Sequence, residues 1–172
     1  MASKPPPERR KFTTLWDEIG YLYDKLLYWL YQQGNPAKAL PYAERLERLL
    51  PKADPGHDGI FTEECWSLVY ETRGDLRKAI EHRENEIRLI RQLQEVCRGN
   101  PDDEVALEGY GYADLADRLD LLATLYRGNG ELEKAITLLS ASKKLCEEHG
   151  IAFDGEDILE EYLEEKSLLC GN

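Results

Sequence analysis

The sequence has few of the side chains from which enzymes and metal sites are most often built. It contains three histidines, and His57, His82 and His149 lie far apart, with no second His or Cys at the spacing of metal ligands. The patterns of phosphate-binding loops and of nucleophile elbows, G-x-x-x-x-G-K-[ST], G-x-G-x-x-G and G-x-S-x-G, are also absent. We therefore predict no enzymatic activity, no catalytic residue, no bound metal and no cofactor.

Long apolar runs and an excess of basic residues are missing as well. No apolar run approaches the ~20 residues that span a bilayer, and the first fourteen residues are too polar for a signal peptide. The net charge of −12 argues against binding to nucleic acid or to an anionic membrane, and mildly favours basic partners. The cysteines, which form no C-x-x-C pair, are predicted to be reduced thiols in the core of a cytoplasmic protein: Cys65, Cys97, Cys146 and Cys170.

The sequence does contain one short motif twice, and we call it the repeated phrase. Residues 74–80, GDLRKAI, return as residues 130–136, GELEKAI, and each copy follows four residues after a tyrosine, Tyr70 or Tyr126. A fainter third copy, GNPAKAL, occupies residues 34–40. The glycine is expected to end one helix in the left-handed conformation, and the next residue (Asp, Glu or Asn) to cap the following helix. The alanine five residues after the glycine would allow the two helices of a hairpin to approach closely. A repeated helix–turn–helix unit is therefore predicted.

Apolar residues at helical spacing extend this pattern over the whole chain. They predict helices, and no strand, at about 15–33, 36–50, 62–73, 76–98, 113–127, 132–149 and 156–169. Thr14 is expected to cap the first helix and Gly150 to end the sixth. Pro41 is expected to bend or shorten the second helix. A short helical turn is predicted at 104–107, and residues 1–13 are predicted to be a disordered arm because they are too polar to bury a helix face.

The repeated phrases resemble the tetratricopeptide repeat, whose pattern is W-x2-L-G-x2-Y, then A-x3-F, then P. The matching residues of the first unit, with Leu30 in the tyrosine's place, are Tyr23, Leu26, Leu27, Leu30, Ala39, Ala43 and Pro51. Those of the second are Glu63, Trp66, Ser67, Tyr70, Ala79 and Arg83. Those of the third are Leu119, Leu122, Ala123, Tyr126, Ala135 and Leu139. The glycines are 40 and 56 residues apart, against a family period of about 34, which we ascribe to longer second helices and to an insertion between Arg98 and Tyr112.

This resemblance implies an all-α fold of antiparallel helix–turn–helix repeats, stacked in a right-handed superhelix and closed by a polar capping helix. The repeat domain would cover residues 14–172, with units at about 14–51, 60–98 and 113–150 and the cap at 156–169. The residues leave one alternative open, an irregular helical bundle whose Gly-acid turns reflect only the need of helices for caps.

The resemblance also implies a binding surface, because the first helix of each hairpin in such stacks lines a concave groove that takes an extended peptide or a partner helix. The corresponding residues here are Tyr21, Asp24, Tyr28, Tyr31, Phe61, Glu64, Leu68, Glu71, Asp117, Asp120, Thr124 and Arg127. They lack the Lys and Asn with which chaperone-binding members hold a carboxylate. Tyrosines and five carboxylates are instead expected to prefer a basic peptide.

Three functions follow as hypotheses. The first is a non-enzymatic adaptor or scaffold that binds a basic protein segment in this acidic, aromatic groove. The second is a self-associating structural module that dimerises through the aromatic first helix, which carries Tyr21, Tyr28, Trp29 and Tyr31. The third, for which the sequence offers no positive sign, is a helical enzyme or ligand carrier with a buried pocket.

Overall fold

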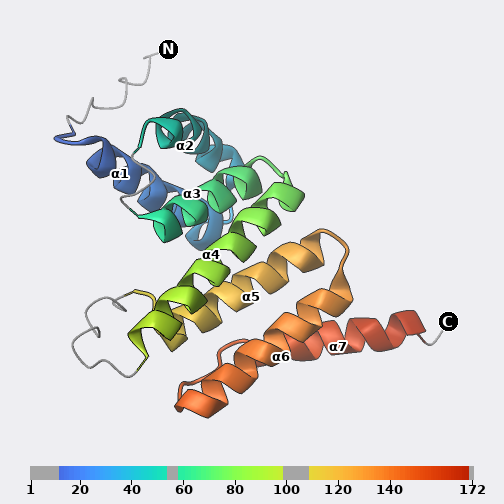
Figure 1. The fold of residues 1–172 in the computed structure, drawn as a ribbon. Helices are drawn as coiled ribbons and strands as arrows, with labels where there is room; N and C mark the ends of the chain where they lie inside the picture. The colour runs from blue at the N-terminus through green and yellow to red at the C-terminus, as the bar shows by residue number, and fades with distance from the viewer. Residues whose placement is uncertain (1–11, 54–57, 99–108, 171–172) are drawn as a thin grey trace. The chain divides into compact units, whose positions relative to one another are not determined.

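The computed structural model describes residues 12–53, 58–98 and 109–170, and within these ranges all regular structure is helical (Figure 1). The elements are α1 (Leu15–Leu27), the π-helical turn η1 (Tyr28–Gln32), α2 (Pro36–Leu49), the 3-10 turn η2 (Leu50–Lys52), α3 (Gly59–Thr72), α4 (Leu76–Cys97), α5 (Tyr112–Gly128), α6 (Leu132–His149) and α7 (Glu156–Cys170). The all-α prediction of helical hairpins is confirmed. The predicted turn at 104–107 and most of the predicted arm lie outside the described residues.

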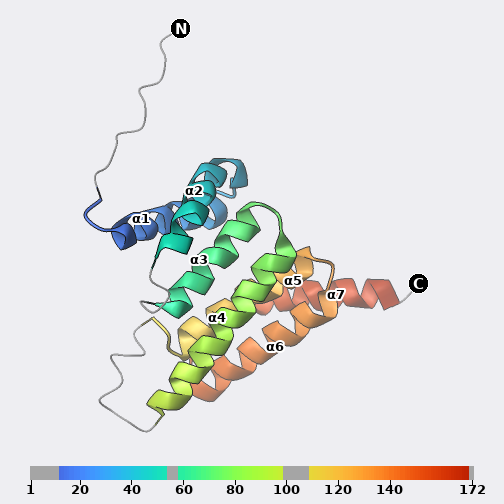
Figure 2. The ribbon, with the colours of Figure 1, turned by 45° about the horizontal axis from the view of Figure 1, so that its top comes forward.

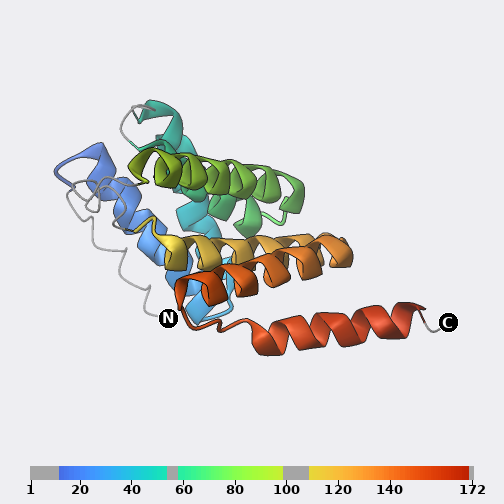
Figure 3. The same ribbon diagram turned by 60° about the horizontal axis from the view of Figure 1, so that its bottom comes forward.

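Contacts divide the chain into two compact units, Met1–Asp54 and Pro55–Asn172. The first unit is the hairpin of α1 and α2. The second unit stacks the α3–α4 hairpin on the α5–α6 hairpin, and α7 then packs against α6 (Figures 1 and 3). Figure 2 shows α4, α5 and α6 running side by side within this second unit. The capping position predicted for the last helix is thus the one it occupies.

The glycine of each repeated phrase ends a helix in the left-handed conformation, as predicted. Gly34, Gly74 and Gly130 have φ angles of +55°, +76° and +84°, a region in which any side chain would be strained. Gly150, which follows α6, has φ of +66° and is the fourth such helix end.

The residue after each glycine caps the next helix in two of the three phrases. The side chains of Asn35 and Asp75 accept hydrogen bonds from the backbone N–H groups of Lys38 and Lys78 at 3.1 and 3.3 Å. The prediction is wrong for Glu131, whose carboxylate makes no capping bond. One of its oxygens instead accepts a hydrogen bond from the Asn129 side chain at 2.7 Å, because the longer glutamate reaches past the helix end.

Apart from that cap, the two full phrases build the same turn. The backbone N–H groups of Asp75 and Glu131 each donate to the carbonyl of the preceding tyrosine at 2.9 Å. The lysine four residues after each glycine then lies over that tyrosine ring, at 4.8 Å in the first case and 4.7 Å in the second.

The fainter phrase uses an aromatic residue where a leucine was predicted. The N–H of Asn35 donates to the carbonyl of Trp29 at 2.7 Å, and Lys38 lies 4.5 Å from the Trp29 ring centre. Trp29, rather than Leu30, therefore takes the tyrosine's place. The cause is the π-helical turn η1, which inserts one extra residue into the last turn of the helix.

Of the two effects predicted for Pro41, bending or shortening, the shortening is not found, since α2 continues to Leu49. Both Pro41 and Ala37, whose carbonyl loses its helical partner, are exposed. Water can satisfy that carbonyl, which lowers the penalty of proline inside a helix.

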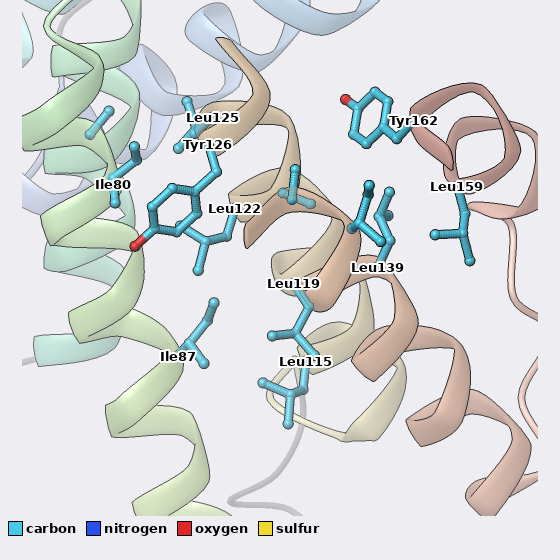
Figure 4. Packing of buried hydrophobic residues seen from close by; sticks show 14 of the residues in the cluster. Ile80, Ile87, Leu115, Leu119, Leu122, Leu125, Tyr126, Leu139, Leu159 and Tyr162 are labelled. Atoms are coloured by element: carbon cyan, nitrogen blue, oxygen red, sulfur yellow. The ribbon is translucent and has the colours of Figure 1, made fainter. Parts of the chain in front are cut away.

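The second unit has a continuous apolar core between its helices. Ala79, Ala123 and Ala135 are fully buried where α3 meets α4 and α5 meets α6. Leucines of α5 and α6 fill the space between these helices and α7, from which Leu159 and Tyr162 point inward (Figure 4). In the described part of the chain, no helix is long and apolar enough to cross a bilayer.

Candidate functional site

Two of the predicted groove residues, Tyr21 and Asp24, lie together on the first unit. They line a hollow of about 610 Å³ whose other lining residues are Phe12, Thr13, Trp16, Asp17 and Gly20. Glycine at position 20 leaves open space beside the helix, since a Cβ there would meet no atom within 4 Å. The hollow therefore combines aromatic rings and carboxylates on one face of α1.

The rings of this hollow are held by neighbouring side chains. The Tyr21 ring centre lies 5.4 Å from that of Phe12, and Lys25 lies 5.5 Å from it on α1. Tyr28 and Tyr31 lie in η1, which follows α1 directly, and are 38% and 43% exposed. Tyr28 makes an edge-to-face contact with Trp29 at 4.9 Å.

Two predicted groove residues of α3 are not surface residues. Leu68 is fully buried and Glu64 is buried with its carboxylate toward Arg83 and Arg118. Phe61 and Glu71 are partly buried. The prediction failed for Leu68 and Glu64 because α3 is enclosed on more of its circumference than the repeat pattern implies.

The predicted groove residues of α5 are largely engaged within the second unit. Arg127 forms a two-pronged ion pair with Glu165 of α7, at 2.7 and 2.6 Å. The Thr124 hydroxyl donates to the backbone carbonyl of Asp120 at 3.1 Å. α7 packs on this side of α5 (Figure 4). Of the four predicted residues, Asp117 alone is exposed and is not held by an ion pair or hydrogen bond of this kind among the described residues.

Asp117 and Asp120 belong to an acidic corner that also contains Asp154. Burial, together with the charges of neighbouring aspartates, raises the pKa of both carboxyl groups, while a hydrogen bond with Ser142 lowers that of Asp120 in part. Asp120 is half-buried, and one of its oxygens lies 3.4 Å from where a Cβ on Gly155 would stand. Asp120 is therefore packed within its own unit and offers little surface to a partner.

The most unusual polar cluster of the molecule was not predicted as a unit. Four charged side chains meet between α3, α4 and α5: Glu64, Arg83, Glu86 and Arg118. Arg83 and Glu86 are fully buried. We call this set the buried ionic cluster.

Glu86 is the centre of the buried ionic cluster. Its two oxygens accept from Arg83 Nη1 at 2.5 Å and from Arg118 Nε at 2.6 Å. Glu64 lies farther from the same two arginines, at 3.8 and 3.5 Å. Two carboxylates therefore face two guanidinium groups, and the cluster is neutral as a whole.

Burial is the main influence on the pKa values of Glu86 and Cys65. Burial raises the pKa of Glu86, and the attraction of Arg83 and Arg118 offsets only part of that rise. Burial and the neighbouring carboxylates also raise the pKa of the Cys65 thiol well above its ordinary value. A thiol in that state is a poor nucleophile, so Cys65 is an inert core residue.

Tyr110 ties the cluster to the ends of three helices. Its hydroxyl donates to Asp58 at 3.0 Å, and its carbonyl accepts from the Gln94 side chain at 2.9 Å. The Arg118 guanidinium lies 6.0 Å from the Tyr110 ring centre. Asp58 in turn caps α3 by accepting from the N–H of Phe61 at 2.9 Å.

The sequence did contain a signal for the buried ionic cluster. Arg83 stands where the repeat pattern requires a large apolar residue and where the third unit has Leu139. A charged residue at a core position implies a buried countercharge, and Glu86 follows it by three residues, within reach on the same helix. The contribution of Arg118 and Glu64 required the tertiary structure.

Among the described residues there is no group of three or more His, Cys, Asp or Glu side chains arranged to hold a metal ion. Cys65, Cys97 and Cys146 are buried free thiols. The Glu63 carboxylate accepts a hydrogen bond from the His82 ring at 2.7 Å, and that ring stacks with Tyr70 at 5.4 Å.

Comparison with known proteins gives no relative: no family model, no curated protein and no solved structure matches the chain.

Proposed function

We propose that this chain is a non-enzymatic interaction module, an adaptor or scaffold of the cytoplasm, that binds a basic peptide or helix of a partner protein. The observation that carries this proposal is the hollow on α1, in which Trp16 and Tyr21 stand beside Asp17 and Asp24. Aromatic rings supply large contact areas with little side-chain entropy to lose, and they attract the cations of Arg and Lys.

The charges of the hollow determine which residue of the partner it would prefer. Asp17 is already used, since its carboxylate accepts from the backbone N–H of Thr14 at 2.9 Å. Asp24 is exposed at the other end of the hollow. We propose that a partner arginine or lysine pairs with Asp24 while its aliphatic stem lies on Tyr21.

The same proposal assigns the chain to the tetratricopeptide-like repeats. Its support is the shared turn of the two full phrases, in which glycine, tyrosine, lysine and alanine play equal parts at residues 70–79 and 126–135. In this class of proteins the first helices of the hairpins carry the ligand, which agrees with the place of the hollow on α1.

Charge reversal of Asp24 tests the proposal. A fluorescent form of the chain is applied to an array of 15-residue peptides that vary in Lys and Arg content, and the best peptide is then titrated in solution. We expect Asp24→Lys to weaken binding by about tenfold or more, and salt to weaken the wild type, because the contact is a partly exposed ion pair. Asp24 is preferred to Asp120 because Asp120 is packed against its own unit.

Asp157→Lys is the matched control, since it makes the same charge change on an exposed position of α7. The control should bind as the wild type does. Selection of acidic or neutral peptides, or equal losses in both variants, would refute a basic ligand at the hollow.

Self-association through the first helix is the second candidate function. It is favoured by Tyr28 and Tyr31, which are the two large aromatic residues of the described chain that remain more than a third exposed. Light scattering separates the candidates. A dimer that Tyr31→Asp dissociates would support self-association, and a monomer at high concentration would exclude it.

A further inference from the structure

The chain carries a basic segment of its own directly before the hollow on α1. Arg9, Arg10 and Lys11 form the only run of three consecutive basic residues in the sequence, and Phe12, which lines the hollow, follows them. We call these three residues the basic segment. Residues 1–11 contain four bases and one acid, so they carry a charge of +3, and residues 12–172 carry −15.

Phe12 holds the start of the described chain against the hollow. It stands three residues before α1 begins at Leu15, yet its ring centre lies 5.4 Å from that of Tyr21. Tyr21 is six residues into the helix, which is about 9 Å of rise from Leu15. The Phe12 side chain therefore reaches back along α1, and the basic segment is attached to the chain at the edge of the hollow.

The hollow offers net negative charge to this segment. Asp17 and Asp24 line it and are both exposed. The hydrogen bond that Asp17 accepts comes from the N–H of Thr14, a neutral donor, and leaves the charge of the carboxylate in place. Lys25, which lies 5.5 Å from the Tyr21 ring centre, offsets one of the two charges. A charge of −1 therefore remains beside the aromatic rings.

The basic segment is also within reach of Asp24. Consecutive Cα atoms are about 3.8 Å apart, so those of Lys11, Arg10 and Arg9 lie at most about 4, 8 and 11 Å from that of Phe12. Asp24 follows Tyr21 by three residues, which is about 4.5 Å along the helix. Arginine and lysine side chains extend this reach further, while their aliphatic stems can cover the aromatic rings.

We propose that the basic segment occupies the hollow on α1 of its own chain, with a cationic side chain at Asp24 and the stems on Tyr21. This step rests on the proposed function, because the segment fills the same hollow by the same chemistry. A partner's basic peptide then binds only when it displaces the segment.

Tethering makes even a weak internal occupant effective. A segment joined to its site by a short connection is present there at an effective concentration on the order of millimolar. Basic peptides of lower affinity than this competition demands are kept out. The basic segment thus makes the hollow selective for partners that bind it tightly.

A fluorescent peptide of residues 1–11, titrated into the full chain, is the probe. Arg9→Ser/Arg10→Ser/Lys11→Ser removes the internal competitor, so this variant should bind the peptide about tenfold or more tightly than the wild type does. Asp24→Lys added to the same variant should remove the gain, because it places a positive charge in the hollow.

Arg77→Ser/Arg91→Ser/Lys144→Ser is the matched control. It removes the same charge from exposed positions of the second unit, so its general attraction for a basic peptide rises equally. The control should bind the peptide as the wild type does. Circular dichroism and melting temperature establish that each variant keeps the fold.

Three results would overturn the internal occupant. Equal affinity of the wild type and Arg9→Ser/Arg10→Ser/Lys11→Ser would show that nothing competes. An equal gain in the control would reflect net charge alone, and a gain that survives Asp24→Lys would place the segment away from the hollow. Competition that grows with the concentration of wild-type protein would identify the segment of a second copy as the occupant.

The peptide array that tests the proposed function separates the two failures. If its best basic peptide binds the wild type and Arg9→Ser/Arg10→Ser/Lys11→Ser equally, the hollow takes basic peptides but has no internal competitor. If no basic peptide binds either form, the proposed function itself fails, and the internal occupant fails with it.

Discussion

The α3–α4 and α5–α6 hairpins share one turn but have different cores. Each has the same tyrosine, glycine, lysine and alanine at the turn, with the lysine over the tyrosine ring. Four residues beyond the alanine they diverge, because Arg83 occupies the position of Leu139. Both side chains are buried, with 0% and 1% of their surface exposed. The same hairpin backbone therefore accommodates either a charged or an apolar side chain at this buried position.

The polar neighbours of this position differ in the same way. Glu64 and Glu86 of the first hairpin correspond by repeat offset to Asp120 and Ser142 of the second. Where the first hairpin has carboxylates facing arginines, the second has an aspartate and a serine, and the Ser142 hydroxyl donates to the backbone carbonyl of Ala116 at 3.2 Å. The repeated phrase therefore specifies the hairpin turn. The core residues beyond the turn differ between the two hairpins and need only be compatible with one another.

Removal of one arginine from the buried ionic cluster is expected to have the largest effect. Arg83→Ala leaves the Glu86 and Glu64 carboxylates buried with Arg118 alone, and breaking a buried pair in this way costs about 3–5 kcal/mol. Leu139→Ala, the corresponding change in the other hairpin, leaves an apolar cavity at a cost of about 2–5 kcal/mol. Urea denaturation of both variants measures the difference. A loss below about 1 kcal/mol for Arg83→Ala would contradict the central place of this arginine.

Overpacking the two hairpin turns is expected to have a smaller and more equal effect. Ala79→Leu and Ala135→Leu each insert a larger side chain between helices that meet at a fully buried alanine. Overpacking of this kind costs about 1–3 kcal/mol. Thermal melts of the two variants should shift downward by similar amounts. An unchanged melt in either would show that the alanine does not set the distance between the helices.

Much of the fold was predictable because its signals are local. The positive φ of Gly74 and Gly130, the cap at Asp75 and the limits of α6 at Leu132 and His149 follow from turn and periodicity rules. The use of Trp29 was not predictable, since a π-helical turn carries no reliable pattern in the residues around it.

The candidate site was predicted less well because exposure depends on tertiary contacts. Tyr21 and Asp24 do line one hollow, whereas Leu68 is buried and Arg127 is paired with a residue of α7. A repeat pattern gives the direction of a side chain from its helix. It does not give what later parts of the chain will place there, and α7 is separated from Arg127 by the whole of α6.

Transplanting the second core into the first hairpin tests whether the ionic cluster is needed. In Arg83→Leu/Glu86→Ser one charge of each sign is removed, and Glu64 remains beside Arg118 at 3.5 Å. Burial raises the pKa of Glu86 despite the two arginines. The arginines therefore do not fully offset the free-energy cost of desolvating its carboxylate. We expect stability within about 1 kcal/mol of the wild type, or higher, as for other buried ion pairs replaced by apolar residues.

The transplant is judged against its single variants. Arg83→Leu and Glu86→Ser alone should each be less stable than the double variant, because each leaves an uncompensated charge. A double variant as unstable as the sum of the two would show that the ionic cluster stabilises the hairpin on its own account.

The smallest expected effect lies in the second hairpin, where Asp120 is the counterpart of Glu64. Burial raises the pKa of Asp120 in the folded protein, and Asp117 and Asp154 add to that rise. The folded state therefore binds the proton more tightly than the unfolded chain does, so stability falls as the pH rises through the folded pKa. Asp120→Asn cannot ionise and should be slightly more stable than the wild type at neutral pH.

The pH dependence of that gain separates charge from packing. Below the unfolded pKa both forms of residue 120 are neutral, so the difference in melting temperature should vanish there. Solvent screening at a half-exposed group keeps the gain small. Asp157→Asn, at an exposed position of α7, is the comparison for the loss of one negative charge elsewhere in the same unit. A gain from Asp120→Asn that persists in acid would instead arise from the new amide's contacts, and the charge at this corner would then play no part in the comparison of the two hairpins.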